Sequence, residues 1–262
     1  MIDHNFKKKF GQNFISDKNL LSAICQDAEV DQNTQVLEIG AGAGTLTEEI
    51  SKKAKKVVSY EIDKDLQSHL LSLNLSNTKF VFGDVMDFST EEIEKDFDGE
   101  YKIIANLPYY ITTPIIFKFL NEAQNLKSLT IMVQKEVAER IVANVGGKDY
   151  GVLSIMVNFF GSAKINRIVS RKMFYPQPNV DSAVVTIKID RNKFENIDKN
   201  KFYKFIQMVF SMRRKTLKNN LLQGGVSEEK INQIDSNTLI LRSEKLAIND
   251  LLDIYLKIID CF

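Results

Sequence analysis

The chain is poor in the residues that build metal sites and disulfide frameworks. Its 262 residues include two cysteines, Cys25 and Cys261, and two histidines, His4 and His69. The cysteines are too few for a disulfide framework and lack the spacing of metal ligands, so we expect no bound metal. Neither histidine stands near a plausible nucleophile, which argues against histidine-based acid–base catalysis.

Long hydrophobic runs are also missing. No apolar stretch approaches the roughly 20 residues that a membrane-spanning helix needs. The N-terminal sequence MIDHNFKKKFGQNF has basic residues but lacks the apolar core of a signal peptide. Hydrophobic residues make up 44% of the chain and charged residues 26%, as in ordinary globular proteins. We therefore expect a cytoplasmic protein, a monomer without a membrane partner.

Acidic residues are absent from three stretches, although the net charge is only +1. These stretches are residues 4–16, 150–180 and 199–227, and the acids gather instead between residues 84 and 100. Such sorting can create a basic face for nucleic acid on a neutral protein, although solvated helix faces or ion pairs between domains would explain single stretches. The candidate RNA contacts are Lys7, Lys8, Lys9, Arg213, Arg214, Lys215 and Lys218.

Short β-rich runs alternate with amphipathic segments in the first two-thirds of the chain. The pattern predicts strands at 35–39, 56–62, 79–83, 101–106 and 128–133, with helices between them. This alternation is typical of an α/β fold, a parallel sheet with helices on both faces, and 181–189 would suit an added antiparallel strand. Later segments are helical, near 200–210, 213–223, 227–234 and 243–260. We expect a catalytic domain over 1–192 and a small all-α C-terminal domain over 193–262.

A glycine-rich loop, LEIGAGAGTLT (37–47), follows the first expected strand. Gly40 and Gly42 would let the backbone approach a ligand closely. The next strand ends near Glu61, where a carboxylate can hold two ribose hydroxyls. A nicotinamide dinucleotide would require a third glycine at position 45, which is Thr45. The spacing therefore favours S-adenosylmethionine, which has no phosphate, although a purely structural turn is the alternative.

Polar residues mark the ends of two further strands. Asp84 could accept a hydrogen bond from the adenine amine of the cofactor, with Val85 beside the ring, or it could simply cap a helix. Asn106 ends the fourth strand. Because ligands bind at the carboxyl ends of the strands in doubly wound sheets, we expect these residues to meet Gly40 and Glu61.

An unusual turn, NLPYY (106–110), begins at Asn106. The side-chain oxygen of Asn106 and the carbonyl of Leu107 or Pro108 could accept the two N–H bonds of an adenine amine. The nitrogen lone pair would then point at a methyl donor, so that positioning replaces a strong base. Tyr109 could stack on the base. The alternative is a structural turn that buries core aromatics.

Five motifs together resemble those of the KsgA/RsmA family, and the resemblance covers nearly the whole chain. They are KKKFGQNF (7–14), LEIGAGAGTLT (37–47), NLPYYITTPI (106–115), FYPQPNVDSAVV (174–185) and VFSMRRKTLKNNL (209–221). The resemblance implies a Rossmann-like class I S-adenosylmethionine-dependent methyltransferase. Such an enzyme dimethylates two adjacent adenines near the 3′ end of 16S rRNA in an assembling small ribosomal subunit. The macrolide-resistance methyltransferases, which modify large-subunit RNA, share the catalytic turn and are the relatives to exclude.

The resemblance also implies roles for residues that the pattern alone does not single out. Asn13 and Ile15 would cover the cofactor pocket, Ile62 would join Glu61 in binding the cofactor, and Phe174 would hold the target adenine opposite Tyr109. The chain has Ile15 where the family usually has leucine, and Ala41 where it often has proline. A second function remains open, namely a checkpoint in ribosome assembly that acts mainly by binding.

Overall fold

Two compact units make up the protein. The computed structural model describes residues 14–261. One unit holds the chain up to Ala138 together with Ala163–Ile189, and the other holds Glu139–Ser162 together with the chain from Asp190 onward. The sequence predicted a single domain boundary between residues 192 and 193. That boundary would place Glu139–Ser162 in the catalytic domain.

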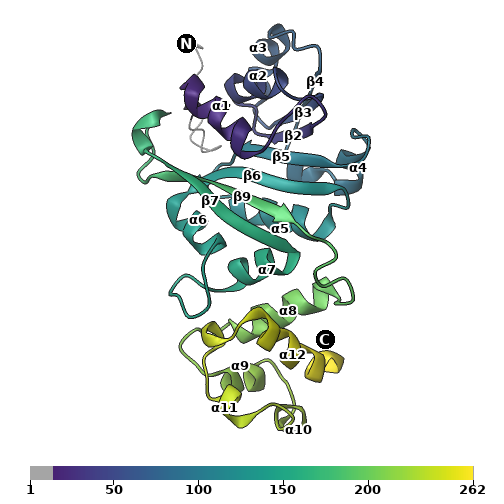
Figure 1. Ribbon diagram of the computed structural model, residues 1–262, viewed down its shortest axis with the longest axis vertical. Coiled ribbons are helices and arrows are strands. Elements are labelled where there is room, and N and C mark those ends of the chain that lie inside the picture. Colours follow the sequence, from purple (N-terminus) through teal and green to yellow (C-terminus); the bar gives the residue numbers. More distant parts are fainter. Residues whose placement is uncertain (1–13, 262) are drawn as a thin grey trace. The chain divides into compact units, whose positions relative to one another are not determined.

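A seven-stranded sheet in the order β4-β3-β2-β5-β6-β9-β7 forms the centre of the first unit (Figure 1). The five strands β2 to β6 are parallel, and β9 pairs with β6 in the antiparallel direction. The predicted α/β fold with an added antiparallel strand is confirmed. The strands are β2 (Gln35–Ile39), β3 (Lys56–Glu61), β4 (Thr78–Phe82), β5 (Tyr101–Asn106), β6 (Leu126–Gln134), β7 (Gly161–Val169) and β9 (Ser182–Ile189).

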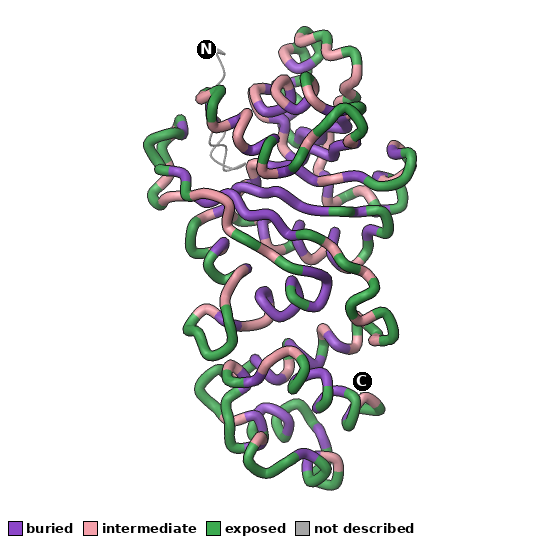
Figure 2. The backbone as a smooth tube through the Cα atoms, viewed as in Figure 1, coloured by how far each residue is buried: buried purple, intermediate pink, exposed green. Residues whose placement is uncertain are grey.

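Helices cover both faces of this sheet, as right-handed connections between parallel strands require. Figure 1 shows α1 (Lys18–Asp27), α2 (Thr45–Ser51) and α3 (Gln67–Ser72) on one face, with α4 (Thr90–Glu94) and α5 (Thr112–Glu122) on the other. The central strands are consequently shielded from solvent on both sides, and every residue of β2 is buried (Figure 2).

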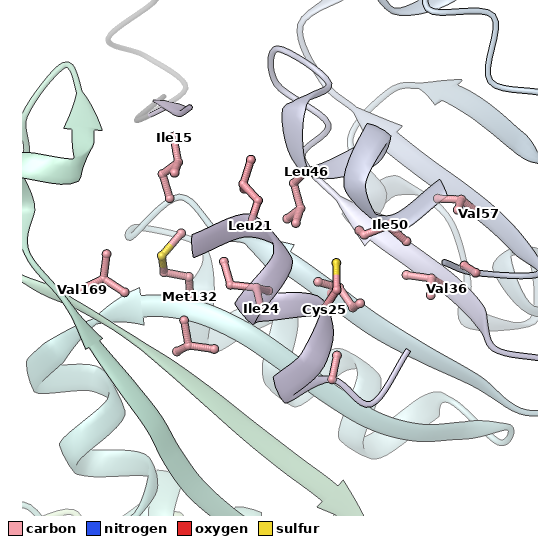
Figure 3. Packing of buried hydrophobic residues seen from close by; sticks show 14 of the residues in the cluster. Ile15, Leu21, Ile24, Cys25, Val36, Leu46, Ile50, Val57, Met132 and Val169 are labelled. Carbon is pink, nitrogen blue, oxygen red and sulfur yellow. The ribbon is translucent and has the colours of Figure 1, made fainter. Parts of the chain in front are cut away.

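A hydrophobic cluster fills the space between α1, α2 and the sheet (Figure 3). It also includes Ile15 and Phe174, which are 4% and 5% exposed. These two residues belong to a separate antiparallel pair, β1 (Phe14–Ile15) and β8 (Phe174–Tyr175). The core therefore anchors β1 and β8 to the large sheet. The other prominent members are Leu21, Ile24, Cys25, Val36, Leu46, Ile50, Val57, Met132 and Val169.

The second unit is helical, and aromatic packing explains why residues 139–162 belong to it. The ring of Phe159, in α7 (Val152–Phe160), stacks on Phe202 with centroids 4.9 Å apart, and Phe202 meets Tyr255 edge-on at 5.4 Å. Within residues 14–261, no helix is long and apolar enough to span a membrane. The remaining α-helices are α6 (Lys135–Ile141), α8 (Lys199–Val209), α9 (Leu217–Gln223), α10 (Glu228–Ile231), α11 (Ser236–Leu239) and α12 (Ile248–Ile258).

The helix predicted from residue 213 begins later, at Leu217. The buried side chain of Asn220 accepts hydrogen bonds from the Met212 N–H, at 2.9 Å, and from the Ser211 hydroxyl, at 3.1 Å. Its amide group also donates to the carbonyl oxygens of Met212 and Thr216. These bonds hold residues 211–216 as a turn, so the basic residues from 213 to 215 lie in a loop.

A buried carboxyl group joins three elements behind the glycine-rich loop. Glu38 of β2 is fully buried, and its Oε2 accepts hydrogen bonds from Thr47 of α2, at 2.6 Å, and Ser59 of β3, at 2.5 Å. Its Oε1 has no hydrogen-bond partner among the described residues. Burial raises the pKa of Glu38 to about 7, and the charge of Glu61 acts in the same direction. The folded protein therefore binds the proton of the Glu38 carboxyl group more tightly than the unfolded chain does.

This shift predicts a pH-dependent stability. Because the pKa rises from an ordinary 4.5 to about 7 on folding, the free energy of unfolding should fall by about 3 kcal/mol between pH 4.5 and 7. Glu38→Gln removes the titration, so its stability relative to the wild type should be higher at pH 8 than at pH 5. Urea denaturation at both pH values measures this change.

Glu91→Gln serves as the control because Glu91 is an exposed glutamate of α4. This variant corrects for the general effect that the loss of one negative charge has on the free energy of unfolding. An equal stability difference between Glu38→Gln and the wild type at pH 5 and pH 8 would show that Glu38 does not titrate in this range.

Candidate active site

The sheet reverses its strand order between β2 and β5, and a pocket opens at the carboxyl ends of these strands. The chain moves from β2 outward to β3 and β4, whereas it moves from β5 in the opposite direction to β6. Ligands bind at such a switch point because the two connecting loops diverge there. Loops after β2, β3 and β5 line the pocket together with β1. Its residues are Phe14, Ile15, Leu21, Ile24, Gly40, Ala41, Gly42, Ala43, Thr45, Leu46, Glu61, Ile62, Asn106, Leu107, Pro108, Tyr109 and Met132.

The glycine-rich loop after β2 forms one wall of this pocket. Gly40 and Gly42 have φ angles of +85° and +56°, which side chains disfavour. A Cβ atom at Gly42 would also lie 3.0 Å from the ring of Phe14. Both positions therefore require glycine, while the approach of this loop to a ligand remains a prediction.

Glu61 provides the charge of the pocket. Its Oε2 accepts a hydrogen bond from the Gly42 N–H at 2.7 Å, and its Oε1 accepts one from the Asp63 N–H at 2.8 Å. Burial raises the pKa of Glu61, while these two N–H groups lower it. Among the described residues that line the pocket, Glu61 is the one charged side chain.

This lining fits S-adenosylmethionine better than a dinucleotide. A pyrophosphate would bring negative charge toward Glu61, and no lysine or arginine lines the described part of the pocket. The sulfonium and ammonium groups of S-adenosylmethionine are positive, and its ribose offers two hydroxyls to a carboxylate. Loop and charge together therefore agree with the cofactor that the glycine spacing favours.

The other predicted cofactor residues differ in position. Ile15 and Ile62 line the pocket, and the carbonyl of Ile15 accepts a hydrogen bond from the Thr45 hydroxyl at 2.9 Å. Asp84 and Val85 lie outside its lining. The Oδ1 of Asp84 accepts a hydrogen bond from the Met86 N–H at 2.9 Å and caps a short 3-10 turn, so the capping interpretation holds. A contact between Asp84 and an adenine remains a prediction.

The NLPYY turn forms the opposite wall, and its hydrogen bonds distinguish its two carbonyls. The Pro108 carbonyl already accepts from the Ile111 N–H, at 3.2 Å, and from the Thr112 hydroxyl, at 3.1 Å. The Leu107 carbonyl has no hydrogen bond within residues 14–261. Of the two backbone carbonyls that the sequence offers as acceptors, Leu107 is therefore the one that the described residues leave without a hydrogen bond.

The two aromatic residues predicted to hold the target base differ in exposure. Tyr109 lines the pocket, and its hydroxyl is hydrogen-bonded to Ser182 of β9 at 2.9 Å. Burial raises the pKa of Tyr109. Phe174 instead packs in the hydrophobic cluster and does not line the pocket. The place of Phe174 opposite Tyr109 thus stays a prediction. The neighbouring residue, Tyr175, is 66% exposed.

The predicted RNA contacts divide into three groups. Lys7, Lys8 and Lys9, like the cofactor candidate Asn13, lie outside the described residues. Arg213 donates hydrogen bonds to the carbonyls of Lys148 and Tyr150 within the second unit, so it supports a neighbouring loop. The exposed side chains of the third group have no hydrogen bond or ion pair to the described residues. They are Arg214, Lys215 and Lys218.

Eight pocket residues were not predicted from the sequence as site residues, namely Phe14, Leu21, Ile24, Ala41, Ala43, Thr45, Leu46 and Met132. Phe14 lies inside the KKKFGQNF motif, and Thr45 opens the helix after the glycine-rich loop, so both had a signal nearby. Met132 lies in the short apolar run 131–133 of β6, where no feature of the sequence sets it apart. Only its register beside Asn106 in β5 brings it to the pocket.

The position of Glu61 predicts its effect on cofactor binding. Glu61→Ala should weaken S-adenosylmethionine binding by about 1–3 kcal/mol, because a charged acceptor for the ribose is lost. Glu61→Gln keeps one oxygen acceptor and should lose less affinity. Titration calorimetry measures both, with NAD as a ligand that should not bind. Unchanged affinity in Glu61→Ala would contradict the assignment, and binding of NAD would contradict the choice of cofactor.

Comparison with known proteins assigns this chain to a family. Residues 3–259 match the model of a family described as ribosomal RNA adenine dimethylase. A ribosomal RNA small subunit methyltransferase A from Caldanaerobacter subterraneus subsp. tengcongensis is 44% identical over 87% of this chain and 86% of its own length. The one from Clostridioides difficile is 41% identical over 94% of this chain and 89% of its own length.

A solved structure agrees with this assignment. A dimethyladenosine transferase from Plasmodium falciparum is 27% identical, covers 95% of this chain and 98% of its own, and superimposes with a TM-score of 0.80. With a family match along almost the entire sequence, the protein belongs to the ribosomal RNA adenine dimethylases, which are S-adenosylmethionine-dependent methyltransferases.

Proposed function

We propose that this protein transfers methyl groups from S-adenosylmethionine to the N6 amines of two adjacent adenines near the 3′ end of 16S rRNA. The products are N6,N6-dimethyladenosines. The observation that carries the proposal is the NLPYY turn at the end of β5, which faces the glycine-rich loop across the switch point of the sheet. The relatives that match most of the chain are named as small-subunit enzymes, which favours this target over large-subunit RNA.

The reaction requires an amine whose lone pair is withdrawn from the adenine ring. The Asn106 side-chain oxygen and the Leu107 carbonyl each accept one N–H bond, which directs the lone pair toward the methyl group. S-adenosylmethionine supplies that methyl group on a sulfonium. Because no histidine, lysine or arginine lines the described pocket, orientation rather than a strong base drives the transfer. The surplus proton leaves to solvent after the transfer.

Tyr109 holds the base that carries this amine. Its hydroxyl bond to Ser182 fixes the ring at the pocket, so the aromatic face is positioned before the base arrives. A base that enters must already be unpaired or be turned out of its stack, which suits an adenine in an RNA loop. Phe174 would reach the opposite face after leaving its place in the hydrophobic cluster.

The partner that we propose is 16S rRNA within an assembling small subunit, bound by a monomer in the cytoplasm. Residues 211–218 of the second unit support an RNA contact because three exposed cations lie together without a partner in the described chain. A turn held by the Asn220 side chain carries two of them, Arg214 and Lys215. An assembly checkpoint would use the same surface, so catalysis has to be tested directly.

Transfer of tritiated methyl groups tests the proposed reaction. Small subunits that lack the modification should accept label from S-adenosylmethionine, and digestion to nucleosides should give N6,N6-dimethyladenosine. Asn106→Ala should lower single-turnover transfer by about 100- to 1,000-fold, because the amine loses an acceptor that orients it. The exposed Asn232→Ala is the matched control.

Cofactor affinity must be measured in the same Asn106→Ala preparation, since Asn106 also lines the pocket. Near-normal transfer would reject the role of Asn106. Label on large subunits, or binding to small subunits without any transfer by the wild type, would reject the proposed reaction.

A salt series tests the RNA surface. Each lost phosphate contact should lower the slope of log affinity against log salt by roughly 0.7 to 0.9. Lys215→Gln with Lys218→Gln should therefore bind undermethylated small subunits more weakly, with a slope lower by about 1.5, while the melting temperature hardly changes. Lys64→Gln with Lys95→Gln is the control, because both lysines are exposed in the first unit. Parallel slopes for the wild type and the 215/218 variant would mean that these lysines do not touch phosphate.

A further inference from the structure

An exposed tyrosine lies beside the pocket, at a position that the proposed reaction does not use. In the pair of β1 and β8, Tyr175 lies opposite Phe14, and Phe174 lies opposite Ile15. Directly opposed residues place their side chains on the same face of a strand pair. Ile15 and Phe174 point into the core, so Phe14 and Tyr175 share the other face.

The pairing with Phe14 places Tyr175 next to a lining residue of the pocket, although Tyr175 itself does not belong to the lining. The ring of Phe14 lines the pocket and covers Gly42. Tyr175 is therefore one strand away from the cofactor loop, and it is 66% exposed. Its chain neighbour, Phe174, is the residue expected to hold the target base, so an occupied pocket brings substrate to Tyr175.

The surroundings of Tyr175 suit single-stranded nucleic acid. Met173 and Val180 are 37% and 40% exposed, and Arg171 and Lys172 are exposed cations. No acidic residue occurs from 171 to 180. The loop is braced, since Arg171 donates to the Asn179 carbonyl at 2.9 Å and its N–H donates to Asp181 at 2.9 Å. Aromatic faces among basic residues are typical of surfaces on which unpaired bases stack.

We propose that Tyr175 is a stacking platform for the nucleotide next to the target adenine. This inference rests on the proposed function, in which two adjacent adenines are methylated. While one adenine occupies the pocket, the other is attached to it by a single phosphodiester and remains outside. Tyr175 holds that second base by its aromatic face, and the positive charge of Arg171 and Lys172 offsets the phosphates beside it.

A second exposed tyrosine is less suited to this role. Tyr110 follows Tyr109 in the catalytic turn and is 60% exposed. Burial raises the pKa of Tyr110, and so does the negative charge of Asp84. Asp84 is the residue expected at the cofactor adenine. Tyr110 thus has the negative charge of Asp84 nearby, which would repel phosphates, whereas Tyr175 lies among basic residues on the strand that carries Phe174.

Stacking gives the enzyme a preference for a purine neighbour. Every base has a face that can stack, but purines present a larger one than pyrimidines do. The platform would therefore favour an adenine pair over an adenine followed or preceded by uracil, without hydrogen bonds to the second base. Each adenine of the pair is held in turn while the other reacts.

Variants of Tyr175 test the platform. We expect Tyr175→Ala to raise the concentration of undermethylated small subunits needed for half-maximal single-turnover transfer by about ten-fold, as for the loss of one stacked base. The maximal rate should change less. Tyr175→Phe keeps the aromatic face and should behave as the wild type. Leu71→Ala, which removes a 53% exposed side chain from α3, is the matched control.

The substrate supplies the second half of the test. The test uses small subunits in which one of the two adenines is replaced by uracil. With these subunits, the wild type and Tyr175→Ala should differ less in the concentration needed for half-maximal transfer, because less stacking remains to be lost. Calorimetry should show the same S-adenosylmethionine affinity for wild type and both variants.

Four outcomes would overturn the proposal. These are wild-type behaviour of Tyr175→Ala, equal losses in the Ala and Phe variants, an altered cofactor affinity, and an effect of Tyr175→Ala that does not depend on the neighbouring base. Failure of the wild-type enzyme to methylate either adenine would instead refute the proposed function, so the two failures are distinguishable.

Discussion

The parallel pairing of β2 with β5 holds the site together. These two strands are the neighbours between which the strand order reverses, and their following loops face one another across the pocket. In the proposed reaction, one loop supplies the glycines that approach the cofactor, and the other supplies Asn106 and Leu107. The distance between methyl donor and amine would therefore depend on this pairing. Burial of every residue in β2 makes the pairing resistant to exchange with water.

Two buried glutamates shape the electrostatics around the glycine-rich loop. Glu61 lines the pocket and bonds to Gly42, whereas Glu38 lies behind the loop and bonds to Thr47 and Ser59. Their negative charges repel, and burial raises the pKa of both. A positively charged ligand in the pocket relieves part of this repulsion, while a phosphate would add to it. Cofactor choice is thus supported by the buried charges as well as by the glycine spacing.

The sequence predicted the parts of the fold that have a regular pattern. The parallel strands are rich in β-branched and aromatic residues, and the residues at their ends placed Gly40, Glu61 and Asn106 correctly at one edge of the sheet. The strands β1 and β8 span two residues each, which is too short for any periodicity. The segment 139–162 joins the helical unit through contacts with rings distant in sequence, such as Phe202, and these are invisible without the fold.

The hydrogen bonds of the NLPYY turn have a consequence for the order of events on a single adenine. In the proposed reaction, an unmodified amine offers its two N–H groups to the Asn106 side-chain oxygen and the Leu107 carbonyl, because the Pro108 carbonyl already accepts two hydrogen bonds. After one methyl transfer only one N–H remains, so one acceptor loses its partner. The second transfer then starts from an amine that is held on one side and free to rotate on the other. The same geometry that orients the first step leaves the second step less constrained, and the dimethylated product, which has no N–H left, is the form that these two acceptors would hold least.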